Sequence, residues 1–172
     1  MIDKKMEDAL NNQINEELFS AYLYFAMAAD FEHKNWLGMA NWMKIQAQEE
    51  MAHALKLYNW INERGGKAEF QAIKMPQSNW DSPLAAFKEA YGHEQHITSC
   101  IYDLVKTARN TGDIATEIFL QWFVTEQVEE ESNASAIVDQ IEKVQESTNA
   151  MVMLDKELGF RTLATPVQVS GE

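Results

Sequence analysis

The sequence predicts an all-α protein: a four-helix bundle with one long crossover and a short fifth helix. In four long segments, apolar residues recur at alternating steps of three and four, which keeps them on one face of a helix. Glycine and proline are scarce, with 7 and 3 copies in 172 residues, as long helices require. The connections between the segments are short except for one, residues 66–82, which lacks helical periodicity and contains Pro76.

The first two helices are expected over residues 3–31 and 37–64, and the glycine pair at 65–66 ends the second. A helix of that length is about 40 Å long at 1.5 Å per residue. The 66–82 stretch can reach up to about 55 Å when extended, so it can run the whole length of the bundle. We therefore expect the third helix to lie parallel to the second, as in bundles with one long crossover.

Turn and cap residues place the remaining helices. Ser82 followed by Pro83 is typical of a helix N-terminus, so the third helix is expected over 83–109. A turn follows, and Asp113 is a suitable cap for a fourth helix that ends near residue 146. A short helix over about 149–158 should end at a glycine. We expect one domain over 1–172, with the bundle at 3–146 and an irregular tail at 160–172, where Pro166 prevents further helix.

Composition excludes several classes of function. The formal net charge of -13 argues against nucleic acid or an anionic membrane as the main partner, and fits either attraction of cations or simple solubility. No run of 18 apolar residues predicts a membrane span, and residues 1–10 are too polar for a signal peptide. The single cysteine, Cys100, excludes an intramolecular disulfide framework and a four-cysteine metal site. Together these features favour the reducing cytoplasm.

Polar residues interrupt the apolar stripe near the middle of all four long segments. Buried carboxylates are costly unless they are paired, hydrogen-bonded or bound to metal. Taken singly, each acid could reach solvent at the edge of its stripe, and Gln127 could be a buried amide. Their recurrence in all four segments predicts a cation in the bundle core, bound by six residues: Glu17, Glu50, His53, Glu94, Gln127 and Glu130.

The ligand types indicate which metal. Glu50 and His53 are three residues apart on one helix face, so both can bind one ion. Carboxylates with one imidazole suit iron, manganese or zinc, and iron is the usual redox-active choice. Several acids able to bridge favour two metals. Di-iron carboxylate bundles carry Glu-x-x-His on two helices, whereas this chain has Gln127-x-x-Glu130 in place of the second motif.

Other polar and aromatic residues near these positions allow further interpretations. Glu49, Glu126 and Glu129 lie one position off the core residues and form either a solvated face or a third, weaker metal site. Tyr24 and Trp122 are either core packing or electron donors during oxygen reduction. His93 and His96 flank Glu94 off the stripe and are expected at the surface or an interface.

These motifs resemble bacterial non-haem ferritins over about residues 3–160. The similar stretches are Gln13-Ile14-Asn15-Glu16-Glu17-Leu18 with Tyr24 downstream, Ala47-Gln48-Glu49-Glu50-Met51-Ala52-His53, His93-Glu94-Gln95, and the stretch from Leu120 to Glu131. The resemblance implies iron storage: oxygen or hydrogen peroxide oxidises Fe²⁺ at a two-iron ferroxidase centre, and Fe³⁺ passes into a cavity as mineral. It also implies a hollow homo-oligomer of twenty-four subunits with the fifth helix at its fourfold axes.

The resemblance also assigns ligands. One iron matches Glu17, Glu50 and His53. The other matches Glu50 as a bridge, with Glu94 and Glu130 and with Gln127 nearby. The positions that match a third site are Glu49, Glu126, Glu129 and Glu130.

Four other classes of protein are alternatives to a non-haem ferritin. A haem-containing bacterioferritin is suggested by Met51, but Gln127-x-x-Glu130 departs from that family's second motif, so no haem is expected. A DNA-protecting cage places its ligands between subunits and usually has basic tails, unlike this chain. A rubrerythrin needs a four-cysteine module. A metal-free interaction protein would lack bound metal on purification.

The fifth segment gives a separate reason to expect an oligomer. It is apolar and follows a break at residues 147–148, so it need not pack along its own bundle. Burial against symmetry-related copies would satisfy both features. The acidic charge would then draw cations through pores of the shell.

Overall fold

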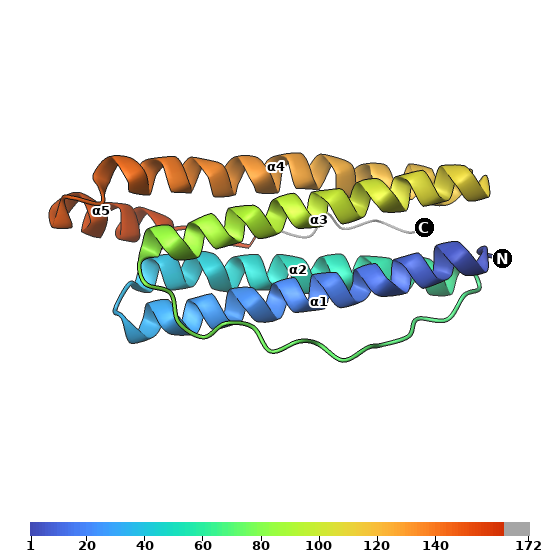
Figure 1. The fold of residues 1–172 in the computed structure, drawn as a ribbon, viewed down its shortest axis with the longest axis horizontal. Helices are drawn as coiled ribbons and strands as arrows, with labels where there is room; N and C mark the ends of the chain where they lie inside the picture. Colours follow the sequence, from blue (N-terminus) through green and yellow to red (C-terminus); the bar gives the residue numbers. More distant parts are fainter. Residues whose placement is uncertain (164–172) are drawn as a thin grey trace.

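The computed structural model describes residues 1–163 and confirms the all-α prediction. Within those residues the chain forms five helices and no strand (Figure 1). The helices are α1 (Lys4–His33), α2 (Leu37–Glu63), α3 (Pro83–Thr111), α4 (Ile114–Val144) and α5 (Thr148–Leu158). None of them is long and apolar enough to cross a membrane.

Side-chain caps begin three of the long helices, and two of them, Ser82 and Asp113, are the predicted ones. The side chain of Asp3 accepts a hydrogen bond from the backbone N–H of Lys5 at 2.9 Å, and Ser82 accepts from Ala85 at 3.1 Å. Asp113 likewise accepts from the N–H of Thr116 at 3.1 Å. Each bond satisfies a backbone donor that the helix leaves unpaired. The helix ends differ from the predicted ones by about two residues, as expected where only the last turn is in question.

The long crossover runs along the bundle, as predicted. In Figure 1 the 64–82 segment returns beside α1 and α2 to the end where α2 begins, so α3 lies parallel to α2. The buried Asn11 holds this segment, because its amide donates to the carbonyl of Lys67 at 3.0 Å and its oxygen accepts from the N–H of Glu69 at 2.8 Å. Further along, the backbone N–H of Trp80 donates to Asp30 at 3.2 Å.

The apolar core consists of two clusters, one toward each end of the bundle. One contains Phe31, Met43 and Phe87, and the other contains Leu10 and Ile101. On each long helix, the polar residues predicted to bind metal fall between the segments that supply the two clusters. The bundle therefore has a polar layer between two apolar ends.

The short helix packs differently from the expectation. Three apolar side chains of α5, Met151, Leu154 and Leu158, are buried in the first cluster with residues of α2 and α4. The carboxylate of Asp155 also accepts a hydrogen bond from the backbone N–H of Met39 at 2.9 Å. The expectation that α5 need not pack on its own bundle was therefore wrong, although Met153 stays 72% exposed. Part of the predicted tail, including Pro166, lies outside the described residues.

Candidate metal centre

The six polar residues predicted to bind metal are all buried in the middle of the bundle. They come from all four long helices, and the exposure of each is between 1% and 7%: Glu17, Glu50, His53, Glu94, Gln127 and Glu130. None of the five charged or titratable groups among them reaches solvent as an edge residue would. Burial at this level demands a partner for every carboxylate oxygen and ring nitrogen.

Glu17, Glu50 and His53 form a compact group of ligand atoms. The Nδ1 atom of His53 lies 3.3 Å from Oε2 of Glu50 and 3.9 Å from Oε2 of Glu17. One ligand atom from each of the three residues lies within 4.8 Å of the others. Helices α1 and α2 position them, and the i, i+3 spacing on α2 puts Glu50 and His53 on the same face.

Two atoms in this group have no hydrogen-bond partner among residues 1–163. They are Oε2 of Glu17 and Nδ1 of His53, and both are buried. Leaving such a group unsatisfied costs about 1–3 kcal/mol. An ion bound between them would use both lone pairs, so the residues present fit a metal cation.

The remaining predicted ligands surround this group and are held by hydrogen bonds. The amide of Gln127 donates to Oε2 of Glu94 at 3.2 Å and to the backbone carbonyl of the same residue at 3.3 Å. The hydroxyl of Tyr24 donates to the other oxygen of Glu94. The side-chain amide of Gln46 links Glu130 to Glu50. Tyr24 therefore lies within the polar layer, fully buried, and contacts a predicted ligand directly.

Burial and mutual repulsion control the protonation of the centre. Burial, reinforced by Glu50, raises the pKa of Glu17 to about 8 and that of Glu130 to about 7. The same two causes raise the pKa of Glu94 well above its ordinary value. Burial opposes charge on Glu50 and His53 too, but their attraction outweighs it. The pKa of Glu50 is lowered and that of His53 is raised to about 10.

These pKa shifts indicate that the centre keeps protons when no metal is bound. Near neutral pH, Glu50 is ionised beside a protonated His53, while the other three acids hold part of their protons. Metal ligands must be deprotonated, so a cation that binds here displaces protons.

Sequence reasoning missed several residues that hold the centre, among them Gln46 and Arg161. Gln46 is fully buried, and its amide donates to Oε1 of Glu50 at 3.0 Å and to Oε2 of Glu130 at 2.7 Å. Its own oxygen accepts a hydrogen bond from Arg161 at 2.8 Å. Gln46 stands on the same stripe four residues before Glu50, so periodicity could have found it. Arg161 follows α5 in a segment with no pattern, and no sequence signal pointed to it.

The three acids predicted to form either a solvated face or a third metal site, Glu49, Glu126 and Glu129, are only partly brought together. Glu49 is half-buried and its carboxylate lies 2.5 Å from the guanidinium of Arg161. Glu126 is half-buried and Glu129 is exposed. Burial raises the pKa of Glu49, although Arg161 opposes this, and it also raises the pKa of Glu126. These three acids therefore form neither a fully solvated face nor a closed cluster of ligands.

The flanking aromatic and histidine residues have defined contacts. The ring of Trp122 meets that of His53 edge to face, with centroids 5.4 Å apart. His93 is half-buried and its Nε2 atom lies 2.7 Å from the hydroxyl of Ser20. His96 is exposed, as predicted.

Comparisons with known proteins agree with this fold. The family model described as Ferritin-like domain matches residues 7–144. The chain is 42% identical over 162 residues to the bacterial non-heme ferritin of Staphylococcus aureus strain USA300, covering 94% of this chain and 98% of that one. It is 40% identical to the bacterial non-heme ferritin of Staphylococcus epidermidis, with the same coverage.

Solved structures give the same result. An open pore ferritin from the hyperthermophilic archaeon Archaeoglobus fulgidus is 48% identical, with a TM-score of 0.93. The match covers 94% of this chain and 100% of that ferritin. A closed form of the same ferritin, engineered by site-directed mutagenesis, is 47% identical, with a TM-score of 0.94 and coverage of 95% and 100%. A four-helix bundle with a buried polar layer defines the class of protein, and the chain belongs to the ferritin family. Membership of this family implies a role in iron storage.

Proposed function

We propose that this chain is a ferroxidase that oxidises Fe²⁺ and stores the product as ferric mineral inside a hollow homo-oligomer. The observation that carries the proposal is the pair of unsatisfied atoms, Oε2 of Glu17 and Nδ1 of His53, which face the carboxylate of Glu50 in a buried site. Carboxylate and imidazole donors suit iron, and the family match supports the same cargo.

Each predicted ligand has a role in the proposed centre. Glu17, Glu50 and His53 bind one iron. Glu50 also bridges to the second iron, which Glu94 and Glu130 complete with Gln127 nearby. Anionic ligands stabilise Fe³⁺ relative to Fe²⁺, because its greater charge is better matched. Each Fe²⁺ gives up one electron, so two irons reduce one oxygen molecule to peroxide, which takes up two protons.

Two further groups are assigned supporting roles. Tyr24, whose hydroxyl donates a hydrogen bond to Glu94, is a candidate electron donor when oxygen needs more electrons than the two irons supply. Glu49, Glu126 and Glu129 form a weaker third iron site through which iron passes. That site requires Glu49 to exchange its contact with Arg161 for the metal.

Storage requires an enclosed volume that one bundle does not provide. We infer a closed shell, with twenty-four subunits as the family resemblance implies, acting in the cytoplasm on Fe²⁺ with oxygen or hydrogen peroxide. The net charge of -13 favours cations as partners and disfavours nucleic acid and anionic membranes.

The test is an anaerobic titration with Fe²⁺, followed by exposure to oxygen. We expect the wild-type chain to bind two irons per subunit tightly and to oxidise them in a fast phase. Glu50→Ala removes the bridging carboxylate and should abolish that phase, while Glu63→Ala, an exposed glutamate on the same helix, should not. Unchanged initial rates in Glu50→Ala would overturn the site assignment.

Haem binding at Met51 is the second candidate that the structure makes testable. Met51 is 48% exposed and lines an apolar hollow of about 360 Å³ with Ile14, Leu18, Tyr58 and Phe70. The names of the bacterial relatives argue against haem. Protein produced with ample haem should therefore lack a stoichiometric Soret band. A band that is lost in Met51→Leu would instead place the chain with the haem-containing members.

A further inference from the structure

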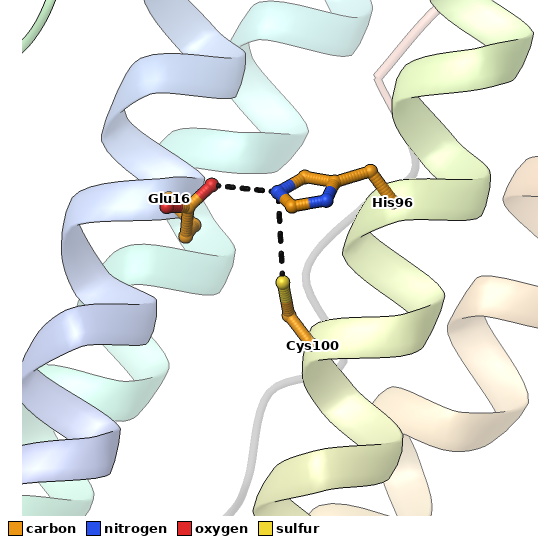
Figure 2. Close-up of side chains that lie close together, drawn as sticks. All are labelled: Glu16, His96 and Cys100. Carbon is orange, nitrogen blue, oxygen red and sulfur yellow. Dashed lines mark hydrogen bonds and ion pairs between the residues drawn. The ribbon is translucent and has the colours of Figure 1, made fainter.

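A second group of metal-ligating side chains lies outside the proposed iron centre. It contains Glu16 of α1 and His96 and Cys100 of α3, whose side chains converge in the space between the two helices (Figure 2). The Nε2 atom of His96 lies 3.1 Å from Oε2 of Glu16 and 3.6 Å from Sγ of Cys100. His96 and Cys100 are one helical turn apart, so they share a face of α3.

This group is separate from the iron centre in exposure and in ligand type. The side chain of Glu16 is 37% exposed and that of His96 is 55% exposed, whereas the neighbouring Glu17 is buried. The proposed iron ligands contain no sulfur. Cys100 is the only cysteine in the sequence, and it is half-buried.

The distances suit tetrahedral coordination. With metal–nitrogen and metal–oxygen bonds of about 2.0–2.1 Å and a metal–sulfur bond of about 2.3 Å, ligand atoms in a tetrahedron lie about 3.3–3.6 Å apart. The two separations from Nε2 of His96, 3.1 and 3.6 Å, are close to these values, and all three ligand atoms lie within 4.8 Å of one another. Only small side-chain adjustments would place one ion among them.

Hydrogen bonds alone satisfy this arrangement poorly. A single ring nitrogen, Nε2 of His96, faces both the Glu16 carboxylate and the Cys100 sulfur. If Nε2 carries a proton, it donates to Glu16 and cannot accept from the thiol. If Nε2 lacks the proton, it accepts from the thiol but its lone pair faces an anionic oxygen. A cation among the three groups would use all the lone pairs at once.

We propose that Glu16, His96 and Cys100 bind one Zn²⁺ ion, with a water molecule in the fourth position. Thiolate and imidazole ligands favour Zn²⁺ over Fe²⁺, which lies lower in the affinity series for divalent metals. The site therefore selects a metal other than the proposed cargo. The ion would also link α1 to α3, because the three ligands come from those two helices.

Zinc binding at this site changes the state of Cys100. Burial, followed by the negative charge of Glu16, raises the pKa of the Cys100 thiol to about 11, so the sulfur is protonated near neutral pH in the absence of metal. Only the thiolate binds Zn²⁺, so binding releases this proton. The bound sulfur should then react more slowly with alkylating agents.

The test uses Co²⁺ as a spectroscopic probe on the full-length, assembled protein without bound metal. Because Cys100 is the only cysteine, a cobalt–thiolate charge-transfer band can arise only from this residue. We expect such a band to saturate near one Co²⁺ per chain and to disappear when Zn²⁺ is added. Fe²⁺, added anaerobically at the same concentration, should displace much less Co²⁺.

Matched variants separate this site from the iron centre. Cys100→Ser should lose the band, and His96→Ala and Glu16→Gln should weaken Co²⁺ binding at least about tenfold. Glu50→Ala, which alters the iron centre, should keep the band. Circular dichroism of each variant checks that the helices are intact. Absence of the band in the wild-type chain at millimolar Co²⁺, or a band of undiminished affinity in His96→Ala, would overturn the proposal.

Alkylation gives an independent measurement that does not depend on cobalt. Zn²⁺ should slow the reaction of iodoacetamide with Cys100 in the wild-type chain and in Glu50→Ala, but not in His96→Ala. Equal rates with and without Zn²⁺ in the wild-type chain would also contradict zinc binding by this sulfur.

Discussion

The guanidinium of Arg161 lies 2.5 Å from the carboxylate of Glu49, although the two residues are 112 positions apart in the chain. The same guanidinium donates to Gln46 at 2.8 Å and lies over the ring of Trp42, 4.4 Å from its centroid. Gln46 in turn holds Glu50 and Glu130. A residue that follows α5 therefore helps to position the carboxylates of the proposed iron centre.

Removing this arginine should strengthen metal binding at the proposed third site. In Arg161→Gln the Glu49 carboxylate loses its cationic partner and becomes free to bind metal. The ion pair is partly exposed, so its loss is worth up to about 1 kcal/mol, or about fivefold in affinity. Metal occupancy beside Glu49, Glu126 and Glu129 in crystals soaked at a series of concentrations measures the effect. Lys156→Gln, an exposed cation on α5, is the control, and equal occupancies in the two variants would contradict competition by Arg161.

Tyr24→Phe should destabilise the metal-free protein more than the metal-bound protein. The substitution removes the hydroxyl that donates to the buried Glu94 carboxylate. Leaving that acceptor short of a partner costs about 1–3 kcal/mol, whereas a bound cation compensates it. Chemical denaturation with and without Zn²⁺ gives the two values. Tyr22→Phe, at an exposed tyrosine on the same helix, should change neither, and an equal loss in both states of Tyr24→Phe would contradict this role.

Metal binding at the iron centre should release fewer protons as the pH rises. The pKa values of Glu17 and Glu130 are raised to about 8 and about 7, so both acids hold protons below these values and have lost them well above. His53, with its pKa raised to about 10, gives up a proton in both conditions. Titration calorimetry with Zn²⁺ in buffers of different ionisation enthalpy, at pH about 6.5 and about 9, counts the protons.

The proton count must be made in a variant that lacks the proposed zinc site at Glu16, His96 and Cys100. Measurements should therefore use Cys100→Ser throughout. Adding Glu17→Gln should remove about one released proton at the lower pH and almost none at the higher pH. The same number of released protons at both values would show that the carboxyl groups do not take part.

Gly38→Ala should displace α5 from the bundle. A Cβ atom at Gly38 would lie 1.5 Å from the backbone carbonyl oxygen of Asp155, and backbone atoms cannot yield as a flexible side chain does. We expect a loss of several kcal/mol in unfolding free energy, since the burial of Met151, Leu154 and Leu158 depends on this contact. Denaturation measures stability, and sedimentation measures the effect on assembly.

Gly92→Ala is the matched control, because no atom of the described part of the chain lies within 4 Å of a Cβ atom built there in α3. Alanine has the higher helix propensity, so this variant should gain about 0.5–1 kcal/mol. Equal stabilities of the two variants would show that the close approach at Gly38 is not needed.

Local sequence patterns were sufficient to predict most of the fold. Asp3, Ser82 and Asp113 cap helices through bonds to residues two or three positions ahead, which a sequence motif can specify. Helix ends were less certain because the last turn depends on neighbouring contacts. The burial of the six predicted ligands followed from the three- and four-residue period, because that period fixes the face on which each one lies.

The sequence by itself determined the helices, their order and the polar layer, since these depend on spacing along one chain segment. Only the tertiary structure decided which atoms meet across helices. It placed Arg161 on Glu49, packed α5 against α2 and α4, and brought Glu16 to His96 and Cys100. The physical reason is that these contacts depend on the register and separation of packed helices, to within about one ångström, and no periodicity within a single helix encodes that information.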